Sequence, residues 1–406
     1  MTSPVPGAGG ESFLTQLLGD LMSLMGGAGA QRLDLARQLA QQVATGGQPE
    51  PNVDPVDRIR LEELLRVAEL HVAELTGLSP AADGTALSVD AVGPGAWARY
   101  TVDDWSFVLD ALAVPVEGAG LVEADDGDLD EADDGDLERG GAEVLAQFVA
   151  GMGPMFAALQ LGSAVGHLAR TTLGQYEIPI WRPRPALLMV PGNVTRFAEE
   201  WSLPADDVRL WVSLREVTVH GVLGRPHVRG RITELITDVV RGTATDTAGL
   251  VEQLQHLDLS DPGSLEQVLG DPSSLLNAEP SPARRRASEE LNAITTALLG
   301  YVEHVLDRTA TRLLGGRGAL AEAWRRRQLE RDSASRTAEM LFGLDLGPDE
   351  VERGVQFVAG VVERAGEEGL ARLWSAPATL PTPAEIAAPG LWLERISFEV
   401  PEQSSE

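Results

Sequence analysis

Two glutamate–histidine pairs are the candidates for chemistry in this sequence. Glu216 and His220 lie four residues apart in a stretch with helical spacing, so both side chains should project from one face of a helix. Glu303 and His304 are adjacent on a second predicted helix. A carboxylate and an imidazole at such spacing can bind a divalent metal ion, although they more often lie at a surface or a helix interface. The remaining histidines are interpreted as surface or core residues: His71, His167, His227 and His256.

Helices must position these groups, and helical patterns dominate the chain. Apolar residues recur at helical spacing over 32–46, 55–77, 205–222, 226–241, 285–313, 320–342 and 348–374. A brief apolar run at 186–190, between Pro185 and Pro191, predicts a single strand or extended segment. The predicted fold class is therefore mainly α with minimal β-structure.

Several segments resemble one family of proteins in their order and spacing. Residues 207–218 resemble the active-site helix of the zincin-like metallopeptidase type 2 family, which is built around a His-Glu-x-x-His pattern. Residues 187–194, an apolar stretch with a Pro and an Asn near its end, resemble the family's upstream segment. The helix with the second glutamate–histidine pair and the short motifs between 342 and 382 follow the family as well. The likeness covers residues 32–116 and 142–397 and implies a zincin-like helical body.

The resemblance implies a zinc site, and this chain departs from the family at the ligand positions. In the family pattern two histidines one helical turn apart would hold zinc, and the glutamate after the first would activate water. Arg215 and Val219 stand at the two histidine positions, whereas Glu216 keeps the base position. Neither a guanidinium nor an isopropyl group can coordinate zinc. Leu299 also replaces the glutamate of a family Glu-Gly pair. We therefore expect no cofactor and a vestigial Glu216.

Two alternatives stay open at this site. In the first, a shifted ligand set of Glu216, His220, Glu303 and His304 binds zinc, and Glu216 is the general base of a metal-dependent peptidase. In the second, Arg215 replaces the metal as a fixed cation, paired with Glu303 or Glu216, and ties the two helices together. Arg215 could instead point to solvent or to a surface acid, as exposed arginines commonly do.

Composition excludes several kinds of site. The formal net charge is −30, and all 32 basic residues are arginines. So acidic a chain should repel nucleic acid, which we do not expect as a partner. The absence of lysine excludes a phosphate-loop lysine, a pyridoxal Schiff base and a lysine nucleophile. The absence of cysteine excludes disulfides, thiolate metal sites and cysteine catalysis.

Composition also divides the chain into predicted regions. These are a Gly/Met-rich amphipathic segment (1–30), a helical region (31–116), a disordered acidic linker (117–141), the zincin-like helical region (142–397) and a polar tail (398–406). The linker contains an acidic, glycine-containing duplication. It is interpreted as solvated rather than as a calcium loop, because Ala132 and Gly141 fall where oxygen ligands are needed.

Location and function are the last expectations. Residues 144–166 are uncharged but contain too much Gln, Pro and Gly for a membrane span. The apolar run at 13–25 follows no cationic segment, so a cytoplasmic location is expected. Its stripe could join copies into a homo-oligomer or be an ordinary core helix. The leading hypothesis is a family member without zinc peptidase activity that binds or scaffolds an unidentified protein or peptide, and the alternative is the metal-dependent hydrolase.

Overall fold

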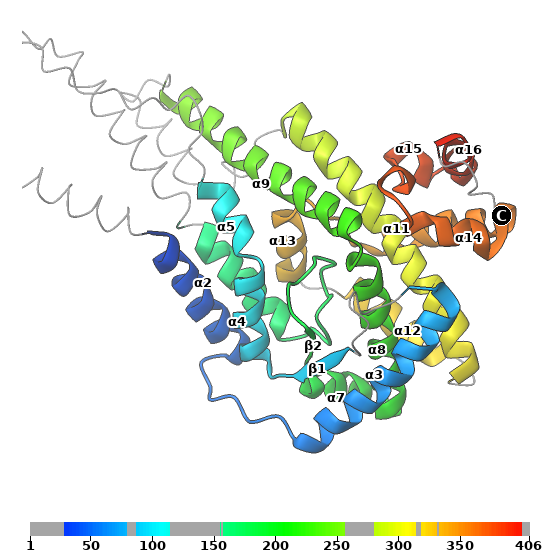
Figure 1. Cartoon of the computed structure of the whole chain (residues 1–406). Helices are drawn as coiled ribbons and strands as arrows, with labels where there is room; N and C mark the ends of the chain where they lie inside the picture. Colours follow the sequence, from blue (N-terminus) through cyan, green and yellow to red (C-terminus); the bar gives the residue numbers. More distant parts are fainter. Residues whose placement is uncertain are drawn as a thin grey trace, which may run out of the picture.

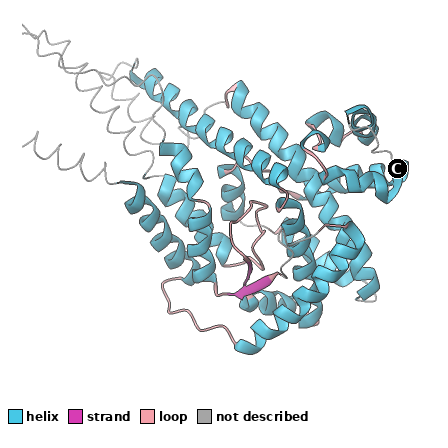
Figure 2. Ribbon diagram, in the orientation of Figure 1, coloured by secondary structure: helices cyan, strands magenta, loops and turns pink. Residues whose placement is uncertain are grey.

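The computed structural model describes residues 28–78, 87–113, 155, 157–255, 280–313, 318–330 and 333–399 (Figure 1). Helices form almost all of their regular structure, and the predicted mainly α fold class is confirmed (Figure 2). The α-helices are α2 (Ala28–Thr45), α3 (Pro55–Thr76), α4 (Pro94–Asp104), α5 (Ser106–Ala113), α7 (Pro191–Glu200), α8 (Ala205–Leu223), α9 (Pro226–Gln255), α11 (Pro282–Leu313), α12 (Gly318–Leu329), α13 (Ser333–Leu341), α14 (Pro348–Ala371), α15 (Pro383–Ile386) and α16 (Pro389–Glu399).

Helix boundaries follow local sequence signals. Proline occupies the first turn of α3, α4, α7 and α14, where its fixed φ suits a helix start. Gly77 ends α3 with a φ of 66°, a left-handed conformation that glycine adopts without strain. The pattern at 320–342, predicted as one helix, forms two, and Ser333 at the start of the second is a residue type that favours helix starts.

The strands are two short parallel segments. β1 (Ser88–Ala91) pairs with β2 (Ala186–Met189), with Ser88 opposite Ala186. β2 is buried at every position and lies within the apolar run that predicted it. β1 was missed within the predicted helical region because only Val89 is buried, so it carries no periodic pattern.

The helix with the family motif, α8, lies in the middle of the molecule. Every residue from Leu210 to Leu223 is buried, because α8 contacts α3, α7, α9 and α11. Two acidic residues in its first turn, Asp206 and Asp207, interact favourably with the helix dipole. Helices that precede residues 117–141 in the sequence share one hydrophobic core with helices that follow them, since α3 packs on α8 and α5 on α9.

A buried stretch without helix or strand passes beside α8. It precedes β2 and is seen as a loop among the helices in Figure 2. Every residue from 172 to 180 is buried. Loops usually run over the surface, because a buried backbone needs partners for its N–H and C=O groups. Backbone groups supply some of the partners of this buried loop (residues 172–180), since the Val190 N–H donates to the Leu173 carbonyl, and side chains of neighbouring elements supply others.

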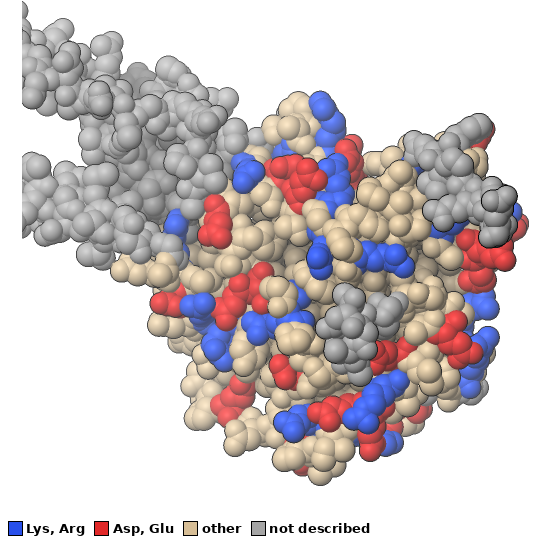
Figure 3. Space-filling view, in the orientation of Figure 1, with Lys and Arg blue, Asp and Glu red and all other residues tan. Residues whose placement is uncertain are grey.

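Some predictions lie outside the described residues. These are the stripe at 13–25, the acidic linker with its calcium-loop alternative at 117–141, and the end of the chain beyond 399. No helix among the described residues is long and apolar enough to cross a membrane. On the face shown in Figure 3, arginines are interspersed with acidic side chains, and the described residues form no continuous basic stripe there.

Candidate functional site

Glu216, at the base position of the motif, is enclosed by protein. Only 1% of the residue is exposed. Its Oε2 accepts a hydrogen bond from the backbone N–H of Tyr176 at 2.8 Å, and its Oε1 accepts one from the guanidinium of Arg215 at 3.0 Å. Burial raises the pKa of Glu216, although the positive charge of Arg215 and the backbone N–H act in the opposite direction.

Arg215 forms an ion pair with Glu216, one of the two predicted carboxylate partners. The same guanidinium nitrogen donates to the backbone carbonyl of Tyr176 at 2.9 Å. The guanidinium also lies over the ring of Trp324 on α12, 5.1 Å from its centroid. Arg215 is buried, so the solvent-facing alternative is wrong. This ion pair lies within α8 and does not itself tie two helices together.

Together, Arg215 and Glu216 bind both polar groups of one residue in the buried loop. Glu216 accepts from the Tyr176 N–H, while Arg215 donates to the Tyr176 carbonyl. Gly174 allows this approach, because a Cβ at that position would lie 2.5 Å from Cδ of Glu216. We call this arrangement the Arg215–Glu216 clamp. It satisfies backbone groups that would otherwise be buried without partners.

Helix α12 covers the clamp through two side chains. Arg327 forms an ion pair with the buried Glu177 at 3.2 Å and donates to the carbonyl of Thr171 at 2.8 Å. Its guanidinium lies 5.0 Å from the centroid of the Trp324 ring, the ring that Arg215 also contacts. Aromatic faces attract cations, so the contact between Arg215 and Trp324 holds α12 against the clamp, whereas the contact between Arg327 and Trp324 lies within α12.

A second buried arginine lies near the clamp. Arg182 contacts the Trp97 and Trp105 rings, with 4.8 and 5.2 Å to their centroids, and donates to the Thr101 hydroxyl at 2.7 Å. Burial lowers the pKa of Arg182 to about 10, so it stays protonated at neutral pH. Its carboxylate neighbour is Asp104 at 3.9 Å.

His220 forms a hydrogen bond with the side chain of Tyr176, whose backbone the clamp holds. The Tyr176 hydroxyl lies 2.9 Å from Nδ1 of His220, and the Trp181 ring packs 5.0 Å from the imidazole centroid. Burial and the charge of Glu216 raise the pKa of Tyr176, so its phenol stays protonated beside Nδ1. Burial lowers the pKa of His220 to about 4, so the imidazole is neutral at physiological pH.

We expect His220 to make the fold sensitive to acid. Between pH 6.5 and about 4 the unfolded chain protonates His220 and the folded chain does not, so stability falls as the pH is lowered. The loss should reach about 3 kcal/mol by pH 4. A His220→Gln variant keeps a hydrogen-bond partner for Tyr176, because the amide can donate or accept, but it cannot titrate. Urea denaturation at pH 7 and pH 4 measures the free energy of unfolding, which should decrease less in the variant than in wild type. Equal decreases in the two proteins would contradict the burial of a neutral imidazole.

The second predicted pair is engaged elsewhere. Nε2 of His304 lies 3.1 Å from the carboxylate of Glu367 on α14, and Arg308 pairs with the same carboxylate. Within the described part of the chain, no three histidine or acidic side chains are placed to hold one metal ion. The structure therefore does not assemble the shifted set of Glu216, His220, Glu303 and His304, because His220 and His304 face different partners.

The residues present at the motif do not fit zinc. Arg215 and Val219 offer no donor atom to a metal ion. Glu216 directs both oxygens to protein hydrogens, and a cation already lies beside it. The clamp can neutralise a buried carboxylate and hold a backbone segment.

Sequence reasoning missed the residues that complete the clamp. Tyr176 lies 40 positions before Glu216, and Trp324 lies on a helix far along the chain. The only signal was the stretch Gly174-Gln-Tyr-Glu177, in which a glycine precedes three residues able to donate or accept hydrogen bonds. No spacing rule connects that stretch to α8.

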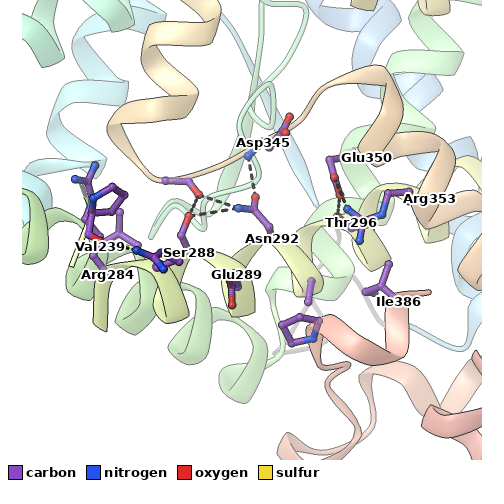
Figure 4. A pocket seen from close by; sticks show the side chains of 15 residues that line it. Val239, Arg284, Ser288, Glu289, Asn292, Thr296, Asp345, Glu350, Arg353 and Ile386 are labelled. Atoms are coloured by element: carbon purple, nitrogen blue, oxygen red, sulfur yellow. Dashed lines mark hydrogen bonds and ion pairs between the residues drawn. The ribbon is translucent and has the colours of Figure 1, made fainter. Parts of the chain in front are cut away.

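A cavity of about 380 Å³ lies between α11, the turn before α14, and α15 (Figure 4). Ser288 and Asn292 both donate to the Gly343 carbonyl, at 2.9 and 3.1 Å, and Thr296 donates to Glu350 at 2.6 Å. These bonds join α11 to the segment that leads into α14. None of the motif residues lines this cavity.

Comparison with known proteins agrees with the architecture. A solved structure from Chloroflexus aurantiacus, described as a "putative hydrolase with a novel fold", is similar with a TM-score of 0.59 and 21% sequence identity. The match covers 90% of this chain and 98% of that one, and at this identity it shows a shared fold. No curated protein matches the sequence. The sequence model of the zincin-like metallopeptidases matches residues 32–393, which confirms the predicted resemblance. This chain belongs to the zincin-like metallopeptidase family.

Proposed function

We propose that this chain is a family member that lacks zinc peptidase activity and acts as a binding or scaffold protein for a protein or peptide. The observation that carries the proposed lack of peptidase activity is the environment of Glu216. A general base must reach the proton that it removes, directly or through one water molecule. Both oxygens of Glu216 are instead bonded to Tyr176 and Arg215 in a buried site.

Electrostatics also support the proposed lack of zinc peptidase activity. In a zinc site the ion is commonly the largest local charge and offsets the carboxylates around it. Here Arg215 supplies a positive charge 3.0 Å from Glu216. A guanidinium stays protonated at any physiological pH and offers donors only, so it balances the carboxylate without a Lewis-acid function.

The metal-dependent hydrolase requires several of these contacts to break. Glu216 would have to leave Arg215 and Tyr176, and His220 would have to leave the Tyr176 hydroxyl. His304 would have to leave Glu367. No contact in the described residues favours that rearrangement. Zinc-dependent hydrolysis by this chain would overturn the proposal.

A peptidase assay tests the proposal. Wild type and Glu216→Gln are incubated with a degenerate fluorogenic peptide library, with added zinc or with chelator. We expect cleavage at the buffer rate under all conditions for both proteins. Zinc-dependent cleavage by wild type that falls by about 100-fold or more in Glu216→Gln, the scale of general-base catalysis, would overturn it. Circular dichroism confirms that the variant is folded.

A further inference from the structure

Helix α3 is apolar on two opposite faces. One face carries Leu61, Leu65, Ala68 and Val72, which are buried where α3 packs on α8. A helix at the surface of a protein normally presents polar residues on the other side. The outward side of α3 instead carries four large apolar residues with high exposure: Val56 (69%), Ile59 (55%), Val67 (38%) and Leu70 (66%).

These four residues form one stripe, which we call the outer stripe. At about 100° per residue they fall within about 80° of the helix circumference, opposite the buried face. In Figure 1, α3 lies at the edge of the helical body. Among the residues that the structure describes, the other large apolar side chains with high exposure are scattered over different elements: Met155, Leu329, Met340 and Leu391. Single exposed apolar residues are ordinary, whereas four that share one face of a helix, two on either side of the charged Glu63, indicate an interaction surface.

The spacing of the outer stripe is symmetric about Glu63. Val56 and Leu70 each lie seven residues from Glu63, and Ile59 and Val67 each lie four residues from it. Two α3 helices packed antiparallel about a two-fold axis at Glu63 would therefore place Val56 against Leu70 of the second copy, and Ile59 against Val67. Two-fold interfaces require this self-complementarity, in which i contacts j and j contacts i.

The charges that flank the stripe are also complementary in this arrangement. Glu62 and Arg66 lie on the same flank of α3. In this arrangement Arg66 of one copy would lie about 3 Å along the helix axis from Glu62 of the other. The two-fold symmetry would give the same pair a second time. Glu63 lies on the axis, where it would face its own copy, but Arg60 already binds its carboxylate at 2.9 Å.

We propose that α3 is a homodimer interface, in which two copies of this chain pack their outer stripes antiparallel about Glu63. The partner is a second copy because the stripe and its charged flank fit the same surface turned by 180°. The proposal is independent of whether the chain hydrolyses peptides.

Sedimentation velocity over a range of concentrations tests the interface. Wild type is expected to sediment as a dimer. The double variant Ile59→Glu with Leu70→Glu places acidic groups in the stripe and should weaken self-association by about 100-fold or more, since each charge would be buried without a partner. Leu391→Glu, an equal change at an exposed leucine on α16, should remain dimeric. A monomeric wild type, or a stripe variant that stays dimeric, would overturn the proposal.

Cross-linking tests the antiparallel register, and the absence of native cysteine makes it clean. Packed helix axes lie about 8–10 Å apart, which a short bismaleimide can span. Glu63→Cys should cross-link with its own copy. Val56→Cys alone should not, because it lies about 21 Å along the axis from its copy. A mixture of Val56→Cys and Leu70→Cys should give heterodimers. Failure of both Glu63→Cys and the mixture to cross-link would overturn this register.

Discussion

Replacement of Arg215 by methionine is expected to lower the free energy of unfolding by about 3 kcal/mol or more. The variant leaves the Glu216 carboxylate buried without its cation and removes the donor to the Tyr176 carbonyl. Methionine preserves much of the side-chain volume against Trp324, so lost packing contributes little. Chemical denaturation monitored by tryptophan fluorescence measures the change.

The companion variants separate charge from packing. Glu216→Gln removes the buried charge, so Arg215→Met with Glu216→Gln should be less destabilised than the two single losses added together. Arg231→Met is the matched control, because Arg231 pairs with Glu234 and Glu290 at a partly exposed site. It should cost less than about 1 kcal/mol. Equal losses at Arg215 and Arg231, or strict additivity of the double variant, would show that the clamp carries no buried electrostatic interaction.

Replacement of Gly300 by alanine is expected to lower the free energy of unfolding by about 3 kcal/mol. Helices α11 and α14 cross at Gly300 and Gly354, and a Cβ at Gly300 would lie 2.1 Å from the backbone carbonyl of Gly354. Backbone cannot move aside like a flexible side chain, so the two helices must separate and lose contacts along their length. Thermal and urea denaturation should both report the loss.

An alanine at Gly230 is the control for this prediction. Gly230 lies inside α9, and a Cβ there meets nothing within 4 Å. Gly230→Ala should therefore raise stability by about 0.5–1 kcal/mol, because alanine restricts the unfolded chain and favours helix. If both alanine variants change stability in the same direction, the close approach of α11 and α14 is not the reason that position 300 requires glycine.

Local patterns were enough to predict the helices that carry the site. The apolar periodicity at 205–222 gave α8, and the run at 186–190 gave β2, since both depend on neighbours in sequence. β1 could not be found in the same way. It is four residues long with one buried side chain, and it exists because it pairs with β2 about 100 residues later. Strand pairing of that kind is a tertiary interaction without a local signal.

The site was only partly predictable for the same reason. The motif placed Arg215 and Glu216 together, and chemistry alone indicated that a buried guanidinium would pair with a carboxylate. The loop that they bind could not be inferred, because it has no regular structure and lies 40 residues away. Glu216 and His220 project from the same side of α8, as their spacing predicted. Both form hydrogen bonds with Tyr176. A pattern of ligands on one helix does not specify what lies opposite it.

The clamp suggests how a metallopeptidase scaffold can persist without metal ligands at its motif. A carboxylate in the core needs a compensating charge and hydrogen-bond donors. Arg215 supplies the charge, and the backbone of Tyr176 supplies a donor in addition. The buried loop gains partners for its backbone from the same two side chains. The motif position thus stabilises the fold in the place where the family pattern implies chemistry.

Elemental analysis of the full chain, purified without added metal or chelator, is the most direct measurement of this interpretation. With Arg215 as the resident cation, we expect zinc far below one atom per chain, and no change in metal content for Glu216→Gln. Near-stoichiometric zinc in the wild type that is lost in Glu216→Gln would contradict it, because the carboxylate would then be a metal ligand rather than half of the clamp.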